Sequence, residues 1–203
     1  MAADAQAAPG AVAPVGATVV DDGLAEAARG VLAEHGLGGL TMERVASVAG
    51  VSRMTLHRRG VGRAEIVAAL VERMVAAERA ELWIPLTEDG DPASRLRAVL
   101  DRRCRLAERH LPVLEALDVA ARDAIFHGDN GMTSPEFTAP LQRLLADGAA
   151  DGSLVSADPE EDATLLYNLV GHTYRHMRTG HGWSPDRARE AVLRIAMEGI
   201  VAR

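Results

Sequence analysis

The chain has 203 residues and a formal net charge of −7, from 22 basic and 29 acidic side chains. This length is enough to bury a substantial core. The acidic balance argues against a protein that coats nucleic acid along its whole length. Apolar residues make up 48% of the chain and aromatic residues only 3%, and alternating β-branched residues are scarce. The composition therefore favours an all-α fold.

Features that the sequence lacks indicate the cellular compartment of the protein. Cys104 is the single cysteine, which excludes an intramolecular disulfide and a cysteine-based zinc site and fits a reducing compartment. No apolar run approaches the roughly 20 residues of a membrane-spanning helix. The Ala-rich N-terminus has no basic segment typical of an export signal. We therefore expect a cytoplasmic protein that contacts no membrane.

The N-terminal segment changes character near Asp21. Residues 1–20 are rich in Ala, Gly, Pro and Val with one charge, which predicts a disordered arm. Asp21 and Asp22 then favour the start of a helix. This helix ends in the glycine-rich stretch that begins at Gly36. Its apolar stripe is formed by Leu24, Ala27, Ala28, Val31 and Leu32.

Residues 41–63 predict two short helices joined by a tight turn. Thr41 can cap the first helix, and Ser52 can cap the second. Gly50 supplies the left-handed conformation that ends the first helix. Leu56 is the one large aliphatic side chain that can anchor the second helix. This is the helix-turn-helix arrangement, whose second helix enters the major groove of DNA.

The apolar periodicity behind this head predicts only helices. A long connecting helix begins near Ala64 and ends before Pro85. No strand is long enough to build a sheet. Further helices are expected at about 92–109, 111–126, 135–150, 159–179 and 185–201.

The motif Leu-Thr-Met-Glu-Arg-Val-Ala-Ser-Val-Ala-Gly-Val-Ser-Arg-Met-Thr-Leu, at residues 40–56, resembles the TetR family of bacterial transcriptional regulators. The resemblance covers the whole chain in length and helix order, and about residues 24–75 in motif. It implies a homodimer that binds a palindromic operator in double-stranded DNA and is released when a small molecule enters the C-terminal domain. The dimer would form through the helices at about 159–179 and 185–201.

The expected organisation is an N-terminal three-helix helix-turn-helix head, joined by a connecting helix to a C-terminal helical ligand-binding and dimerisation domain. The predicted parts are a disordered arm at 1–20, a helix-turn-helix DNA-binding domain at 21–63, and a ligand-binding and dimerisation domain at 64–203 whose connecting helix is 64–84.

The end of the second helix departs from the family. The family commonly has an aromatic residue, usually Tyr, where this chain has His57, and it has His-Phe where this chain has Arg59 and Gly60. The family's Phe packs the end of the second helix on the core, and Val61 can partly fill that space. The departures bear on the operator sequence and the phosphate contacts. They also keep open an alternative, a helical small-molecule-binding or protein-interaction module that has lost DNA binding.

The segment 53–63 holds four arginines and no acid, which favours DNA contact over an ordinary solvated face. Helix-turn-helix proteins read bases mainly from the N-terminal part of the second helix. Arg53 and Met54 are therefore the predicted base readers, since Arg can bind a guanine and Met a thymine methyl group. Ser52 and Arg63 are predicted to bind phosphates with Thr55 and His57. The full predicted DNA-binding set is Thr41, Ser52, Arg53, Met54, Thr55, His57, Arg58, Arg59 and Arg63.

A ligand cavity between the C-terminal helices is expected on general grounds. The polar groups available to it are few, so we expect a largely apolar effector. The candidate lining residues could equally be plain core. They are Trp83, Leu100, Cys104, Leu117, Phe126, Phe137, Leu141, Tyr167 and His172.

No catalytic signature stands out, so the chain is not expected to be an enzyme or to bind a cofactor. His172 and His176 are spaced to share a metal, but no Glu stands between them as in helical zinc sites, and surface or pocket-edge histidines are the preferred interpretation. Cys104 could sense redox state beside neighbouring arginines, but a buried apolar role is preferred. The sequence therefore predicts a ligand-responsive DNA-binding regulator that acts as a repressor.

Overall fold

The computed structural model describes residues 20–117 and 133–201, and its regular elements are all helical. The prediction of an all-α fold is confirmed. Leu154 and Val201 form an isolated antiparallel bridge and not a strand. No helix in these ranges is both long and apolar enough to cross a membrane. In chain order the elements are α1 (Asp22–Gly39), α2 (Met42–Val48), α3 (Arg53–Arg58), α4 (Arg63–Trp83), η1 (Ile84–Thr87), α5 (Pro92–Arg109), α6 (Leu111–Ala116), α8 (Pro135–Asp151), α9 (Pro159–Thr179) and α10 (Pro185–Glu198).

Most predicted helix limits agree with the structure, and one does not. The helix expected at 111–126 is wrong in its extent, because α6 ends at Ala116 and Leu117 takes an extended conformation with φ −91° and ψ 138°. No glycine or proline marks this end, so the apolar periodicity gave no local sign of it. The rest of that predicted helix and residues 1–19 of the predicted arm lie outside the described residues.

The head is built around one apolar core. Leu24, Val31 and Leu32 of α1 are buried together with Val45 of α2 and Leu56 of α3. Three helix starts are ordered by side-chain caps, and two of these caps, Thr41 and Ser52, were predicted from the sequence. The capping oxygens accept backbone N–H bonds from Leu24, Arg44 and Thr55, and they belong to Asp21, Thr41 and Ser52.

The two short helices of the head end in the same way. Gly50 and Gly60 both have a φ of 68°, in the left-handed region. The N–H groups of Gly50 and Val51 bond back to Ser47 O and Ala46 O, at 3.3 Å and 3.0 Å. Two such bonds following a left-handed glycine form the Schellman motif, which satisfies the last carbonyls of a helix.

The end of α3 repeats this pattern ten residues later. The N–H groups of Gly60 and Val61 bond to His57 O and Leu56 O, both at 3.0 Å. Val61 is buried in the head core with Leu56. The left-handed backbone conformation at this position therefore favours glycine, and the buried Val61 side chain completes the head core next to it.

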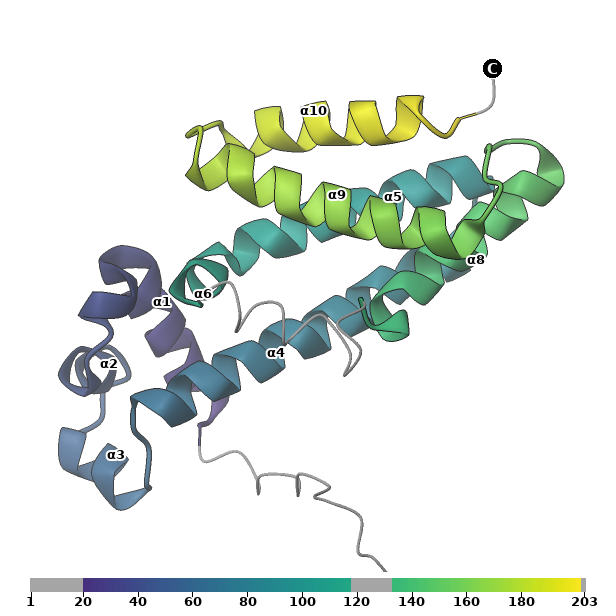
Figure 1. Cartoon of the computed structure of the whole chain (residues 1–203). Coiled ribbons are helices and arrows are strands. Elements are labelled where there is room, and N and C mark those ends of the chain that lie inside the picture. The colour runs from purple at the N-terminus through teal and green to yellow at the C-terminus, as the bar shows by residue number, and fades with distance from the viewer. Residues whose placement is uncertain (1–19, 118–132, 202–203) are drawn as a thin grey trace, which may run out of the picture.

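The remaining helices form a larger body, with α5 in contact with α4, α8, α9 and α10. A second apolar core runs through it, and its fully buried side chains include Leu96, Leu100, Phe137 and Leu141. α4 belongs to both cores. Its N-terminal half places Ile66, Leu70 and Met74 in the head core, and its C-terminal half places Leu82 in the body core. Figure 1 shows this helix running from the head into the body.

The body core also contains a charged pair. Glu78 of α4 and Arg103 of α5 are 6% and 8% exposed and form an ion pair. Tyr167 of α9 donates its hydroxyl to Glu78 Oε1 at 2.9 Å, and Arg103 Nε donates to Tyr167 O at 2.9 Å. The guanidinium carbon lies 3.3 Å from the centroid of the Tyr167 ring. Three helices are thus tied by one fully engaged polar cluster.

The position of the Arg103 guanidinium also explains why residue 171 is a glycine. Any Cβ on Gly171 would collide with Arg103 Nη2, so the side chain of α5 fits against α9 only because this residue is Gly. The group that lies closest to Gly171 therefore belongs to α5.

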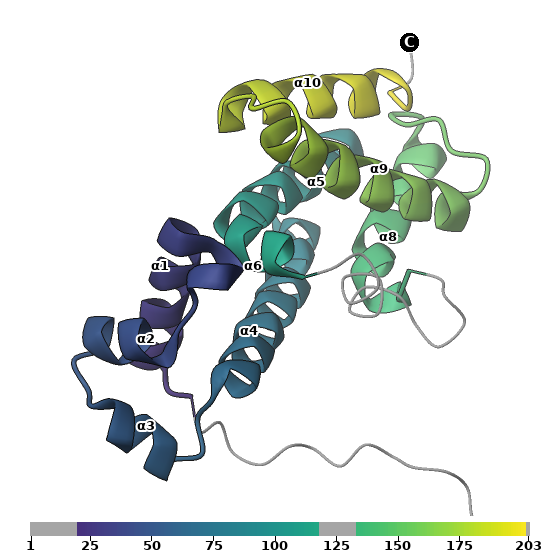
Figure 2. The same ribbon diagram turned by 60° about the vertical axis from the view of Figure 1, so that its left-hand side comes forward.

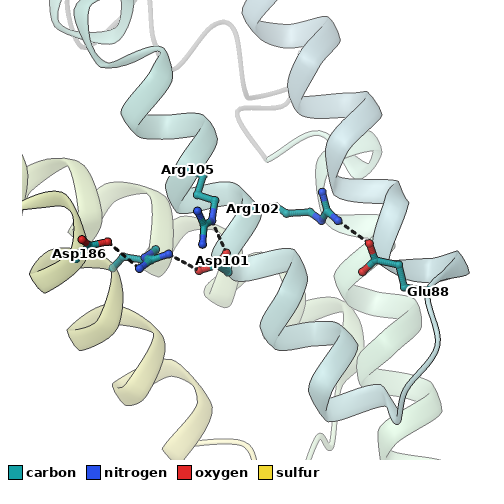
Figure 3. A network of polar contacts seen from close by, with 6 residues as sticks. Glu88, Asp101, Arg102, Arg105 and Asp186 are labelled. Carbon is teal, nitrogen blue, oxygen red and sulfur yellow. Dashed lines mark hydrogen bonds and ion pairs between the residues drawn. The ribbon is translucent and has the colours of Figure 1, made fainter.

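Ion pairs also decorate the outer surface of the body. Asp101 of α5 accepts from Arg105 at 2.7 Å and from Arg189 of α10 at 3.3 Å, and Arg102 reaches Glu88 at 2.5 Å (Figure 3). These pairs are partly or fully open to water, and surface pairs each contribute about 0–1 kcal/mol. They orient α5 and α10 more than they stabilise them.

We predict that Gly60→Ala lowers the free energy of unfolding by about 1–2 kcal/mol, because a Cβ is unfavourable at a left-handed residue. A Cβ at this position meets no atom within 4 Å, so the backbone conformation alone causes the loss. Gly60→Asn should lose less, since Asn tolerates this conformation. Urea unfolding of the three proteins checks the prediction, and equal stability of wild type and Gly60→Ala would refute it.

We predict opposite effects of two glycine-to-alanine changes within helices. Gly30→Ala in α1 meets no atom within 4 Å and should stabilise by about 0.5–1 kcal/mol through helix propensity. Gly171→Ala has the same intrinsic gain but displaces Arg103 from its buried partners, so it should destabilise by about 1–3 kcal/mol. Thermal unfolding compares them directly, and a higher melting temperature for both variants would contradict the account of Arg103.

Candidate nucleic-acid interface

α3 lies at the tip of the head, at the end of the molecule opposite α9 and α10 (Figures 1 and 2). It has six residues, and Leu56 is the one that is buried. The rest of the helix surface is available to solvent. The single inward anchor predicted from the sequence is therefore what the structure shows.

The N-terminal turn of α3 presents its largest side chains outward. Met54 is 70% exposed, and the Arg53 side chain is 71% exposed. His57 and Arg58 are exposed one turn further along. The predicted base readers and two further members of the predicted DNA-binding set, His57 and Arg58, are therefore all exposed on α3.

The hydroxyl groups near this surface already order the helix starts. Ser52 Oγ accepts the N–H of Thr55 at 3.0 Å and lies 2.9 Å from Thr55 Oγ1. Thr41 Oγ1 accepts the N–H of Arg44 at 3.4 Å. Ser52 and Thr41 therefore cap the N-termini of α3 and α2.

The arginines of this region differ in what they contact. Arg53 Nη1 lies 2.5 Å from Glu43 Oε1 of α2, in a pair whose members are both more than half exposed. Arg59 Nη1 reaches Asp21 Oδ2 at 3.3 Å, and Arg63 Nη2 donates to Leu37 O at 2.7 Å. Arg59 and Arg63 are thus engaged with the α1 side of the head, unlike the outward-facing residues of α3.

The sequence analysis missed the partners of these arginines. Glu43 precedes Arg53 by ten residues, and Asp21 precedes Arg59 by 38. Neither spacing is a local helical pair, so only the packing of α1, α2 and α3 brings the charges together.

The residues expected to line a ligand cavity do not share one environment. Leu100, Cys104, Phe137, Leu141 and Tyr167 are at most 1% exposed and belong to the body core. Trp83 is 45% exposed, and His172 is exposed on α9. Leu117 is half-buried after α6, and Phe126 lies outside the described residues. The structure therefore brings the first five together as packed core.

The two side-chain hypotheses left open by the sequence can be placed as well. Burial raises the pKa of the Cys104 thiol to about 12, so this cysteine stays protonated and inert. His172 Nδ1 lies 3.2 Å from Arg175 Nη2, and the His176 ring meets the His181 ring edge-on, 5.0 Å away. Within the described residues no group of three or more His, Cys, Asp or Glu side chains could hold a metal ion.

The comparison with protein families finds one model, described as bacterial regulatory proteins of the tetR family, which matches residues 24–70. These residues cover α1 to the first part of α4, and they include the whole helix-turn-helix segment. No curated protein matches the chain.

Solved structures share the fold over nearly the whole chain. A TetR/AcrR-family regulator from Thermobifida fusca has a TM-score of 0.67 and 22% identity, covering 87% of this chain and 95% of that one. SmeT, the repressor of the multidrug efflux pump SmeDEF of Stenotrophomonas maltophilia, has a TM-score of 0.64 and 23% identity, with 89% of each chain covered. A TetR-family regulator from a Rhodococcus species has a TM-score of 0.62 and 20% identity, covering 87% of this chain and 97% of that one.

The two comparisons agree with the geometry of the head and body. The helix-turn-helix head at residues 24–70 matches the model of the tetR family of bacterial regulatory proteins, and the chain shares the all-helical fold of solved TetR-family regulators.

Proposed function

We propose that the protein is a ligand-responsive repressor that binds a palindromic operator in double-stranded DNA as a homodimer. The observation that carries the proposal is the open face of α3, on which Arg53, Met54 and Arg58 are exposed. Figure 2 shows this helix at the tip of the head. A helix held by one buried residue and otherwise exposed is suited to enter a major groove.

The contacts of each arginine support different roles. The exposed pair of Arg53 with Glu43 contributes little in water, so a guanine can replace Glu43 as the partner of Arg53. Arg58, Ser52, Thr55 and His57 would bind the DNA backbone around it. Thr41 would bind it at the start of α2.

Arg59 and Arg63 have a second role in this proposal. Their bonds to Asp21 and to Leu37 O fix the position of α3 and α4 on α1. In the DNA complex each arginine would either keep its bond to α1 or exchange it for a bond to a phosphate. Neither role depends on the base sequence, so removing Arg59 or Arg63 should weaken binding to all DNA sequences alike.

The face of α9 and α10 supports the homodimer. Leu165, Leu169 and Ile195 are 58%, 46% and 59% exposed, and all three lie on this helix pair. Leu169 and Ile195 also line a small apolar depression of about 110 Å³ between the helices. A second copy packed here would remove these side chains from water.

The proposed mechanism depends on the distance between the two heads of the dimer. The heads of a dimer must lie about 34 Å apart to enter successive major grooves on one side of the DNA. An effector that binds better to another head spacing shifts the population away from the DNA-bound state. SmeT has been solved in complex with triclosan, and this relative supports a small-molecule effector, which the sequence predicts to be largely apolar.

The alternative, a helical module that has lost DNA binding, depended on the Gly60 departure. Gly60 closes α3 with regular backbone bonds, and Val61 fills the core behind it. The head remains ordered through these two residues, so nothing at this position favours loss of DNA binding.

We predict that Arg53→Ala weakens operator binding by about 1–3 kcal/mol and relaxes the preference at one base pair. Arg63→Ala should weaken binding to all duplexes alike and reduce its salt dependence. The measurement is fluorescence anisotropy with an inverted repeat from the upstream DNA and with single-base variants. Arg194→Ala on α10, another exposed arginine with a carboxylate partner, is the matched control. Unchanged affinity and preference in Arg53→Ala would remove it from the base readers.

We predict that Leu169→Glu combined with Ile195→Glu converts a dimer into a folded monomer, because charged groups would be desolvated in the interface. Light scattering after size-exclusion chromatography gives the molar mass. Val48→Glu on α2 changes an equally exposed apolar residue, 63% exposed, outside the α9–α10 face and should leave the dimer intact. A dimer that survives the double substitution would place the interface elsewhere.

A further inference from the structure

A cleft of about 570 Å³ lies where the head meets the body. Its walls come from α1 of the head, from α4, and from the corner between α5 and α6. Figure 2 shows these elements meeting beside α6. A site here would touch the head and the body at once, and it is separate from the body core where the sequence placed a cavity.

The lining of the cleft combines apolar side chains with charged groups from several elements. Ala25, Leu70, Ala77 and Val113 line it. A ligand with an apolar part could therefore be buried against these four residues. The charged and polar lining residues are Asp22, Glu26, Arg29, Arg73, Glu81, Arg109 and His110.

The three guanidinium groups in the lining come from three helices, and the carboxylate partners of two of them are open to water. Arg29 pairs with Glu26 within α1, where Glu26 is 67% exposed. Arg73 of α4 pairs with Asp22, which is 93% exposed. Pairs this open to water contribute about 0–1 kcal/mol each, so the carboxylate of a ligand can compete with them. Arg109 pairs with Glu81 of α4, which is 26% exposed.

Arg73 offers a further sign of spare donor capacity. Its Nη2 donates to Val20 O at 3.0 Å. Its Nε is buried and has no hydrogen-bond partner among the described residues. A buried donor left unpaired is costly, and a small shift of this side chain on ligand binding would give it an acceptor.

His110 lies in the lining of the cleft, next to Arg109. It is half-buried, and its pKa is lowered first by burial and then by the charges of Arg109 and Arg29, while Glu81 acts in the opposite direction. A neutral imidazole can donate one hydrogen bond to an anion.

We propose that this junction cleft binds a small organic anion that has a carboxylate on an apolar body. The carboxylate lies between Arg109, Arg29 and His110, and the apolar body lies against Leu70 and Val113. Guanidinium groups suit this role because they bind carboxylates with two parallel hydrogen bonds. An effector for this site is therefore amphipathic, in contrast to the largely apolar effector expected from the sequence.

The direct test is isothermal titration calorimetry of the full chain, without DNA, using benzoate and hexanoate as probes. Benzamide and hexanamide are the matched neutral compounds. The carboxylates should bind at least about tenfold more tightly than the amides, as expected for one charge-assisted contact. Arg109→Gln and Arg29→Gln should abolish this preference. Arg105→Gln, which removes an exposed arginine of the same helix outside the cleft, should retain it.

Three results would overturn the site. They are equal binding of carboxylate and amide, no binding of either probe at millimolar concentration, and a preference that survives Arg109→Gln. Circular dichroism of each variant shows that the comparison concerns folded protein. A loss of binding that is equal in Arg109→Gln and Arg105→Gln would indicate only a general charge effect, and this also counts against the site.

The consequence for DNA rests on the proposed function and is measured separately. Because the cleft is lined by α1 and by α4–α6, a bound anion should change the apparent affinity for the inverted-repeat duplex, and Arg109→Gln should remove that change. Carboxylate binding to a protein that binds no duplex would support the site and refute the proposed function. An unchanged duplex affinity with the anion bound would refute the coupling.

Discussion

The burial of α4 in two cores is the constraint on which the rest of the structure depends. Ile66, Leu70 and Met74 fix its first half in the head, and Leu82 and Glu78 fix its second half in the body. A rigid helix shared in this way transmits a change in the body to the head, because neither end can move without disturbing apolar packing. The buried pair of Glu78 with Arg103 adds a directional tie between this helix, α5 and α9.

The free-energy cost of burying Glu78 and Arg103 explains why both charged groups have several bonding partners. Two charges removed from water are unfavourable unless their remaining groups are also bonded. Tyr167 contributes its hydroxyl to Glu78 and both its carbonyl and its ring to Arg103, while Gly171 leaves room for the guanidinium. These contacts specify how α4, α5 and α9 lie against one another. The body is therefore aligned by a polar cluster inside an otherwise apolar core.

The junction cleft and the open face of α3 both belong to the same three-helix head. α1 lines the cleft through Asp22, Ala25 and Arg29, and it also holds Arg59 and Arg63 through Asp21 and Leu37. One helix thus contacts both the proposed anion site and the arginines beside α3. A ligand that reorganises the charges on α1 acts on the head through direct contacts.

The sequence alone determined the secondary structure and the turn, because caps, left-handed glycines and apolar spacing act over a few residues. Ser52, Gly50 and Leu56 were predicted in the roles that the structure gives them. Only the tertiary structure decided the end of α6 at Ala116, the pairing of Arg53 with Glu43, and the placing of Arg103 against Gly171. Those features depend on contacts between helices far apart in the chain, and no local pattern records which charges will meet when the helices pack.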